Sequence, residues 1–223
     1  MSSSPIELIL DSGDEMLEVM ERCHKIVNFK KLVEIKTREI RTNTIISYPE
    51  IEDFCYRPYP NHPKGCPNTH KCEWLNIPNF ETILEYGEYK HFYLIYAEFE
   101  YFKYWLLRLF EAIKTHALDY WTSSRLKCLI YWQNSVKKLL SEFINTLPLA
   151  KPDYILGCGY GLKIKTQKYV GSMENSCINV FTTCKLNGIK LEIRPKDTIH
   201  LVCLLCAKKP VSFKRQKQLT LEV

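Results

Sequence analysis

The stretch His91-Phe-Tyr-Leu-Ile-Tyr-Ala-Glu-Phe99 (HFYLIYAEF) is dense in aromatic and apolar residues. A run of this length with so few polar side chains is typical of a β-strand that is covered on both faces. We therefore predict a strand over residues 91–99 and place it at the centre of a sheet, with the rest of the fold arranged around it.

Further strands are expected on both sides of this segment in the sequence. Residues 32–41 place Val33, Ile35 and Thr37 on one side and charged residues on the other, which is typical of an edge or hairpin strand. Short apolar runs later in the chain predict three more strands, over residues 154–156, 189–193 and 198–206, the last two joined through Pro195.

Helices are predicted between these strands. Apolar residues recur at helical spacing after residue 100, and no proline occurs between Pro78 and Pro148. This pattern favours helices over residues 100–116 and 123–145, the second capped by Thr122 or Ser123. Shorter helices are expected over 14–29 and 171–187, the latter ended by Gly188.

Separated strands mixed with long helices indicate a single α+β domain. We expect a mixed sheet with several packed helices and a Pro/Cys-rich metal-binding loop, built from residues 1–207 and followed by a basic tail over 208–223. With 223 residues, of which 46% are hydrophobic, the chain is large enough to bury one sizeable core.

The charge and the termini limit the classes of partner. A formal net charge of +6 is a mild surplus that supports a nucleic-acid partner only weakly. The apolar run Leu201–Ala207 is far below the roughly 20 residues of a membrane span. Acidic residues stand near the N-terminus, where a signal peptide carries positive charge. We expect a cytoplasmic protein with no membrane partner.

The segment from Cys55 to Cys72, CYRPYPNHPKGCPNTHKC, holds three of the ten cysteines together with two histidines and four prolines. Prolines remove backbone donors and fix φ, so this segment is a shaped loop rather than a helix or an inner strand. Thiolates on a stiff loop suit a metal centre. We therefore predict that Cys55, Cys66 and Cys72 are metal ligands.

A loop with three thiolates requires a fourth ligand. Cys128, on the helix expected over 123–145, is the first candidate, and His62 and His70 are the alternatives because imidazole also binds zinc or iron. Four thiolates suit both a zinc ion and an iron–sulfur cluster. The wide, irregular spacing and the distant fourth ligand favour the cluster, with zinc as the alternative.

Several of these segments resemble a known family. Residues 55–68, CYRPYPNHPKGCPN, resemble the opening motif of a cysteine-rich family of predicted metal-binding proteins of unknown function, found in prokaryotes and their phages. Residues 93–99, Cys128 with the following Tyr-Trp-Gln at 131–133, and residues 172–189 resemble later motifs of the family in the same order. The resemblance covers residues 45–205.

The resemblance implies a thiolate-bound metal, with an iron–sulfur cluster (4Fe–4S) as the expected cofactor, and no assigned activity. It carries over to Cys55, Cys66 and Cys128. At the third position the chain departs from the family pattern, because Cys72 follows Cys66 closely and is followed by glutamate instead of proline. Cys72 and His70 therefore stay as alternatives for the remaining ligand.

The other cysteines are interpreted mainly as core residues. Cys203 and Cys206 are three residues apart in a predicted strand and should face opposite sides of the sheet. Cys177 and Cys184 are expected on one face of the helix over 171–187. Residues 157–161 are interpreted mainly as a plain glycine-rich turn, and Cys158 within it is the alternative candidate for an additional metal ligand or a reactive thiol.

Few other polar residues stand out. Glu98 and Glu174 are carboxylates that could serve a site, although solvated or capping roles are commoner. The histidines outside the loop, His24, His91, His116 and His200, show no spacing that suggests catalysis and are interpreted as structural.

Two functions follow as hypotheses. The first is a metalloprotein whose iron–sulfur cluster has a redox, sensing or enzymatic role. The second is a zinc-stabilised module that binds nucleic acid or another partner, helped by the lysines of the tail.

Overall fold

The fold is described from a computed structural model. It describes residues 32–47, 56–58, 63–64, 79–114, 129–151, 153–158, 162–167, 170–192 and 197–213. The helix expected over residues 14–29 and the start of the one expected over 123–145 lie outside these ranges.

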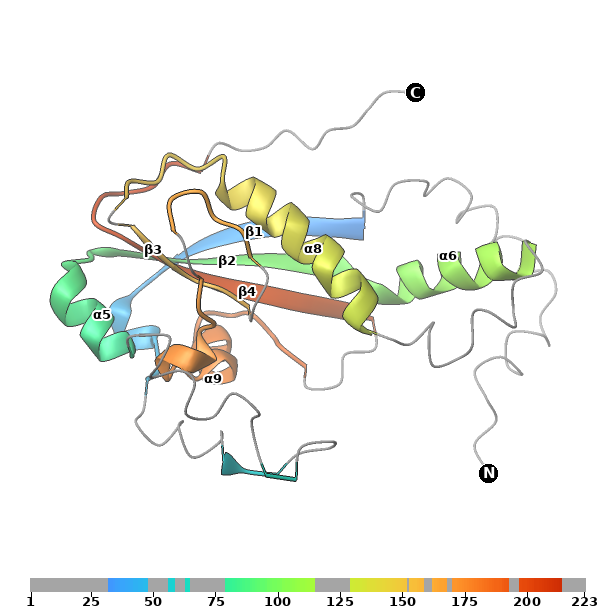
Figure 1. The fold of residues 1–223 in the computed structure, drawn as a ribbon, viewed down its shortest axis with the longest axis horizontal. Helices are drawn as coiled ribbons and strands as arrows, with labels where there is room; N and C mark the ends of the chain where they lie inside the picture. The colour runs from blue at the N-terminus through green and yellow to red at the C-terminus, as the bar shows by residue number, and fades with distance from the viewer. Residues whose placement is uncertain are drawn as a thin grey trace.

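The centre of the molecule is a four-stranded sheet in the order β1-β2-β4-β3 (Figure 1). Its strands are β1 (Val33–Ile40), β2 (His91–Glu100), β3 (Tyr154–Leu156) and β4 (Thr198–Ala207). Strand β2 pairs with β1 on one side and with β4 on the other, so that Ile95 lies opposite both Thr37 and Cys203. The prediction that residues 91–99 form a central strand is confirmed.

The direction of the strands differs from the expected mixed sheet. All neighbouring strands among the described residues pair antiparallel, and parallel pairing is limited to one bridge between Gly157 and Ser172. Strands β2 and β3 run in the same direction, with helices between them in the chain, but β4 lies between them in the sheet. The last strand of the chain therefore separates two strands that would otherwise be parallel neighbours.

Both faces of the sheet carry a hydrophobic core. The odd-numbered residues of β2 from Tyr93 to Phe99 pack with Val136, Leu140 and Ile144 of α8 (Leu129–Ile144). The even-numbered residues from Phe92 to Tyr96 pack on the opposite face, against α5 (Phe80–Gly87) and α9 (Val180–Leu186). Figure 1 shows α8 over one face of the sheet, whereas α5 and α9 lie apart from α8. The α+β fold class is confirmed.

Two helices follow their predictions closely. Helix α6 (Tyr101–Lys114) starts immediately after β2, and α8 ends at Ile144, as expected from Pro148. Helix α5 was not predicted. Its signal in the sequence is Asn79, whose side-chain oxygen accepts a hydrogen bond from the Thr82 N–H at 2.8 Å and so caps the first turn.

The helix expected over residues 171–187 is wrong in its first half. The chain forms a single 3-10 turn, η4 (Glu174–Ser176), and then Cys177 adopts a left-handed conformation with φ of 59°. A new helix, α9, starts after Asn179, whose side chain accepts from the Thr182 N–H at 3.0 Å. Cys177 and Cys184 are both buried, but they do not share a helix face.

The stop at Gly188 is confirmed, with φ of 69°. The Ile189 N–H then donates to the Cys184 carbonyl at 2.8 Å, which ties the following residues to the helix end. The described residues 189–192 form no strand, contrary to the prediction over 189–193.

The remaining described segments attach to the sheet. A short 3-10 helix, η2 (Thr42–Thr44), follows β1. Residues 208–213, the start of the expected tail, return to β2, where the Val211 N–H donates to the Tyr93 hydroxyl at 3.2 Å. Among the described residues, none of the helices combines the length and apolar character needed to cross a bilayer.

Candidate functional site at the open edge of strand β4

The predicted metal ligands lie outside the part of the chain that the structure describes. This holds for Cys55, Cys66, Cys72 and Cys128, and for the alternatives His62 and His70. Within the described ranges, no group of three or more histidine, cysteine, aspartate and glutamate residues is placed to hold a metal ion. Cys158 is the one predicted alternative ligand whose surroundings are described.

Four of the five described cysteines are core residues. Cys177, Cys184, Cys203 and Cys206 are buried. Cys203 packs in the core beneath α8 and Cys206 in the core on the other face, as the alternation of a strand predicted. Burial raises the pKa of Cys184 to about 12 and also raises the pKa of Cys206, so both thiols are protonated at neutral pH.

Strand β4 has an open edge because β3 is short. The last paired residue of β3 is Leu156, opposite Leu204. The chain then turns away, since the Gly157 N–H donates to the Gly171 carbonyl at 2.6 Å and the Gly157 carbonyl accepts from the Met173 N–H at 3.0 Å. Within the described residues, β4 from Thr198 to Cys203 has no strand partner on the side of β3. Cys158 lies next to this unpaired part of β4.

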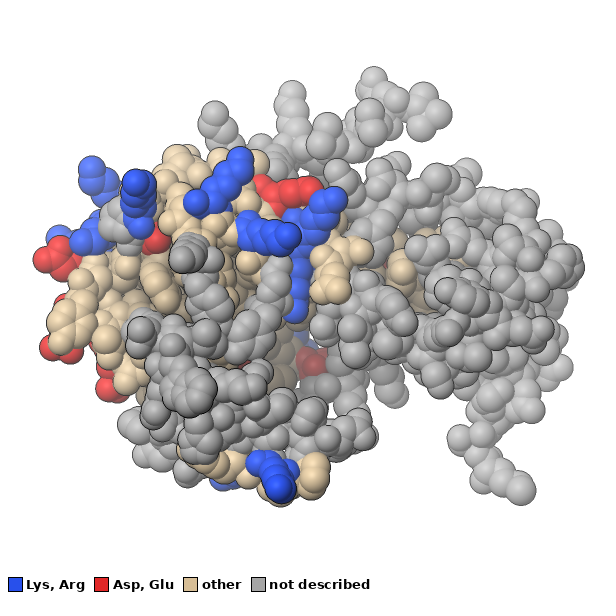
Figure 2. All heavy atoms as spheres, viewed as in Figure 1, with Lys and Arg blue, Asp and Glu red and all other residues tan. Residues whose placement is uncertain are grey.

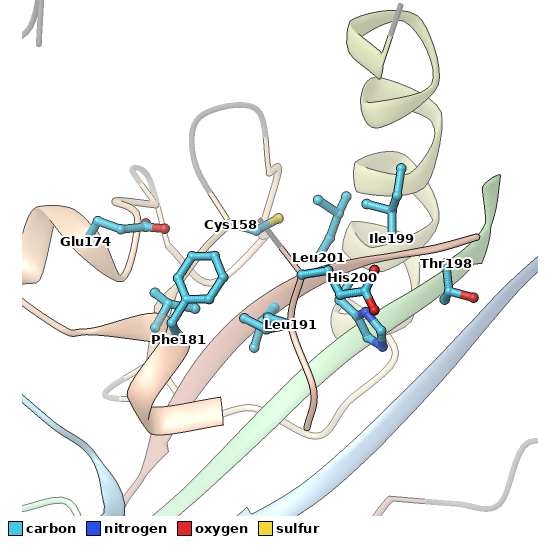
Figure 3. A pocket seen from close by; sticks show the side chains of 11 residues that line it. Cys158, Glu174, Phe181, Leu191, Thr198, Ile199, His200 and Leu201 are labelled. Atoms are coloured by element: carbon cyan, nitrogen blue, oxygen red, sulfur yellow. The ribbon is translucent and has the colours of Figure 1, made fainter. Parts of the chain in front are cut away.

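A pocket of about 200 Å³ lies along this open edge. Residues 198–202 of β4 form one wall, and Glu174, Phe181 and Leu191 come from the segments around α9. Figure 3 shows Phe181 and Leu191 opposite Ile199 and Leu201, with Cys158 between the two groups. The pocket therefore combines an apolar lining with one thiol and a few ionisable side chains.

Cys158 and Cys203 form a pair with unequal proton affinities. The thiol of Cys203 donates a hydrogen bond to the sulfur of Cys158, which lowers the pKa of Cys158, and the positive charge of Lys137 on α8 lowers it further. Burial and the carboxylate of Glu174 oppose this shift. Complete burial raises the pKa of Cys203 well above its ordinary value. Thiolate character is therefore concentrated on Cys158, which is only half-buried.

A cluster of polar side chains extends over three neighbouring strands beside the pocket. Glu34, Glu98 and His200 are neighbours in register on β1, β2 and β4. Lys36 donates to the Glu98 carboxylate, and His200 Nε2 lies 3.6 Å from Glu98 Oε1. The hydrogen bond to Glu98 is the main cause that raises the pKa of Lys36.

Sequence reasoning missed the role of His200 in this arrangement. It lines the pocket and lies next to Glu98, although it was interpreted only as a structural residue. The signal that could have found the pair is that Glu98 and His200 are polar residues within otherwise apolar strands. Only the strand register brings them together.

Three comparisons with known proteins gave no match. They were made against protein-family models, against curated protein sequences and against solved structures. The resemblance to a cysteine-rich metal-binding family therefore stays a prediction.

Proposed function

We propose that this protein binds a metal through cysteine thiolates, with Cys55, Cys66, Cys72 and Cys128 as the ligands. An iron–sulfur cluster is the preferred cofactor, with a redox, sensing or enzymatic role. The proposal places the protein in a reducing compartment such as the cytoplasm, where thiols stay unpaired.

The observation that supports the proposal most strongly is the division of the ten cysteines into buried residues and residues clustered in a proline-rich segment. Four of the described cysteines are buried, three of them in the two cores, and Cys158 is hydrogen-bonded to one of these three. The proposed ligands are four of the five that are left. Because the core cysteines are already accounted for by packing, the clustering of three others in a proline-rich segment supports a separate role for that segment.

The connections of the described fold are compatible with a ligand set from two parts of the chain. Cys128 directly precedes the first described residue of α8, and seven residues separate Ser47 from Cys55, which makes eight Cα–Cα steps. An extended segment of that length spans up to roughly 28 Å, similar to the roughly 24 Å length of a 16-residue helix such as α8. The connection does not confine Cys55 to the face of the sheet on which Ser47 lies.

Metal analysis after anaerobic purification tests this function. We expect iron and sulfide with a broad visible absorption, and loss of both in Cys66→Ser. The matched control is Cys184→Ala, which removes a core thiol and should keep the metal content of the wild type. Stoichiometric zinc in a colourless protein would replace the cluster with a zinc site, and a protein without metal after reconstitution would overturn the proposal.

A second candidate, a zinc-stabilised module that binds nucleic acid, is favoured by one surface. Exposed lysines surround α8: Lys138 lies on the helix, and Lys163 and Lys165 lie on a strap whose backbone N–H groups donate to Ser141 and Asn145 of α8. Figure 2 shows several basic side chains over the face that α8 covers. Phosphate groups bind such surfaces through charge, and the affinity then falls as the salt concentration rises.

Fluorescence anisotropy with a labelled oligonucleotide separates this candidate from the first. If it is correct, Lys138→Glu combined with Lys163→Glu and Lys165→Glu should weaken binding and flatten its salt dependence. Lys190→Glu, which follows α9 near the opposite face, should change neither. Absence of binding at low salt would exclude the candidate.

A further inference from the structure

Two cysteines at the open edge of β4 are used by neither the proposed metal centre nor the lysine surface. Cys158 lines the pocket and is half-buried, whereas Cys203 is completely buried on the adjacent strand. Both are free thiols, and they are joined by a hydrogen bond between their side chains. A thiol that opens to a pocket, with a second thiol in contact behind it, is the arrangement that forms a disulfide on oxidation.

The fold brings these two residues together from distant parts of the chain. Leu156 is the last residue of β3 that pairs with β4, and Cys158 follows it by two residues and lines the pocket together with Leu201 and Val202 of β4. Cys158 also packs against the hydrophobic core that contains Cys203. The two side chains are therefore neighbours in the folded protein, as a disulfide between them requires.

We propose that Cys158 is a site of reaction with hydroperoxides, and that Cys203 converts the product to a disulfide. Cys158 is the attacking residue because it faces the pocket, accepts a hydrogen bond from Cys203 and lies near the positive charge of Lys137. Cys203 is the resolving residue because it is buried and keeps its proton until the first step is complete.

The reaction has two steps. The Cys158 thiolate attacks the terminal oxygen of the hydroperoxide, an S–O bond forms, the O–O bond breaks, and the alcohol or water leaves after taking a proton from solvent. The sulfur of Cys203 then attacks Cys158, an S–S bond forms, the S–O bond breaks, and the departing hydroxide takes the Cys203 proton and leaves as water. Two thiols are oxidised to one disulfide, and the hydroperoxide is reduced to an alcohol and water.

The lining of the pocket selects for small uncharged oxidants. Phe181, Leu191 and Leu201 provide an apolar wall, and the carboxylates of Glu174 and Glu192 disfavour anions. Hydrogen peroxide and short alkyl hydroperoxides fit both conditions, and a pocket of about 200 Å³ has room for them.

Peptide mapping of the full-length protein after treatment with hydrogen peroxide tests the proposal. We expect a peptide linked between Cys158 and Cys203 before Cys177, Cys184 or Cys206 is oxidised. In Cys203→Ala, Cys158 should persist as a sulfenic acid that dimedone traps, and Cys158→Ser should give no linked peptide. The matched control is Cys206→Ala, which removes a buried thiol on the same strand and should leave the linkage unchanged.

The effect of Lys137 on Cys158 is tested by measuring the rate at which Cys158 is oxidised. Lys137→Gln should slow the oxidation of Cys158 by about threefold to tenfold, because less thiolate is present, while Lys138→Gln, on the adjacent position, should leave the rate unchanged. Circular dichroism checks that each variant is folded, and Cys203→Val replaces Cys203→Ala if the smaller residue prevents folding.

Two results would overturn the proposal. One is folded protein in which Cys158 reacts no faster than the buried cysteines. The other is oxidation that links Cys158 to a cysteine other than Cys203. Metal content is measured in the same samples, so that failure of the metal proposal and failure of this one are seen separately.

Discussion

Leu204 shows how completely the sheet is buried at the level of single residues. It lies opposite Leu94 of β2 and Leu156 of β3, and none of the three has exposed surface. Each side chain is in close contact with the next across the strands, because neighbouring residues on one face of an antiparallel sheet have Cβ atoms only about 5 Å apart. A shorter side chain at the middle position leaves a cavity that its neighbours cannot fill.

We expect Leu204→Ala to lower the free energy of unfolding by about 2–5 kcal/mol, the usual cost of a cavity in a well-packed core. The control is Leu186→Ala on α9, where the side chain is 55% exposed and the change should stay within about 0.5 kcal/mol. Urea denaturation of both variants measures the difference. Equal midpoints for the two would contradict the central position of β4.

The pair of Lys36 and Glu98 gives a prediction with a defined dependence on pH. The pKa of Lys36 is raised in the folded state, mainly by its hydrogen bond to Glu98, above the ordinary value of 10.5. The stabilisation is therefore fully present below pH 10.5 and is lost as the pH rises through the higher folded-state pKa. Both side chains are partly exposed, so the contribution is small.

At neutral pH, Lys36→Met should lower the free energy of unfolding by about 0.2–1 kcal/mol, as for other partly exposed ion pairs. Chemical denaturation of the wild type and the variant, repeated at increasing pH, should show this difference shrinking under strongly alkaline conditions. A difference that grows with alkaline pH would mean that the charge on Lys36 does not stabilise the fold.

At the scale of elements, the two short helices depend on their caps and on packing. Helices α5 and α9 have 8 and 7 residues, fewer than an isolated helix needs to be stable in water. Each is capped by the side chain of an asparagine, Asn79 or Asn179. The second cap also concerns the pocket, because Val180 and Phe181 in the first turn of α9 line it.

Asn179→Ala and Asn79→Ala should each lower the free energy of unfolding by about 1 kcal/mol, the usual cost of losing an N-cap. Only Asn179→Ala should also increase the rate at which Cys158 reacts with a maleimide, because fraying of α9 opens one wall of the pocket. Mass spectrometry of the labelled peptide measures that rate. Equal labelling of Cys158 in the two variants would show that α9 does not control access to the thiol.

At the scale of the whole molecule, one sheet supports two cores. Strands β2 and β4 contribute residues to both, and each has strand neighbours on both sides for part or all of its length, whereas β1 pairs only with β2 among the described strands. Amide groups paired on both sides exchange with solvent only when the sheet opens as a unit. The edge strand opens more easily.

Hydrogen exchange of the native protein should therefore be slowest for residues 93–97 of β2 and 204–206 of β4, and faster for β1. The reason is that alternate amides of β1 point away from β2 toward the open edge. Exchange followed by mass spectrometry gives the comparison. Protection of β1 equal to that of β2 would indicate that another segment covers this edge.

The sequence by itself determined the central strand, the α+β class and the core role of most described cysteines. These features follow from apolar runs and from the alternation of apolar and polar residues. Such patterns are local, so they are the same wherever the strand lies in the sheet. The sequence also predicted the start of α6 and the end of α8, because apolar spacing and proline act within a few residues. For Cys158 the sequence left open a plain turn residue, an extra ligand or a reactive thiol, and it could not name Cys203 as its partner.

The tertiary structure decided what depends on contacts between distant segments. The position of β4 between β2 and β3 makes the described sheet antiparallel and places Cys203 against Cys158 and His200 against Glu98. The break at Cys177 and the helix that starts after Asn179 form one wall of the pocket. Strand order and register are set by the surfaces that pack together. A local sequence pattern does not specify which distant segment becomes its neighbour.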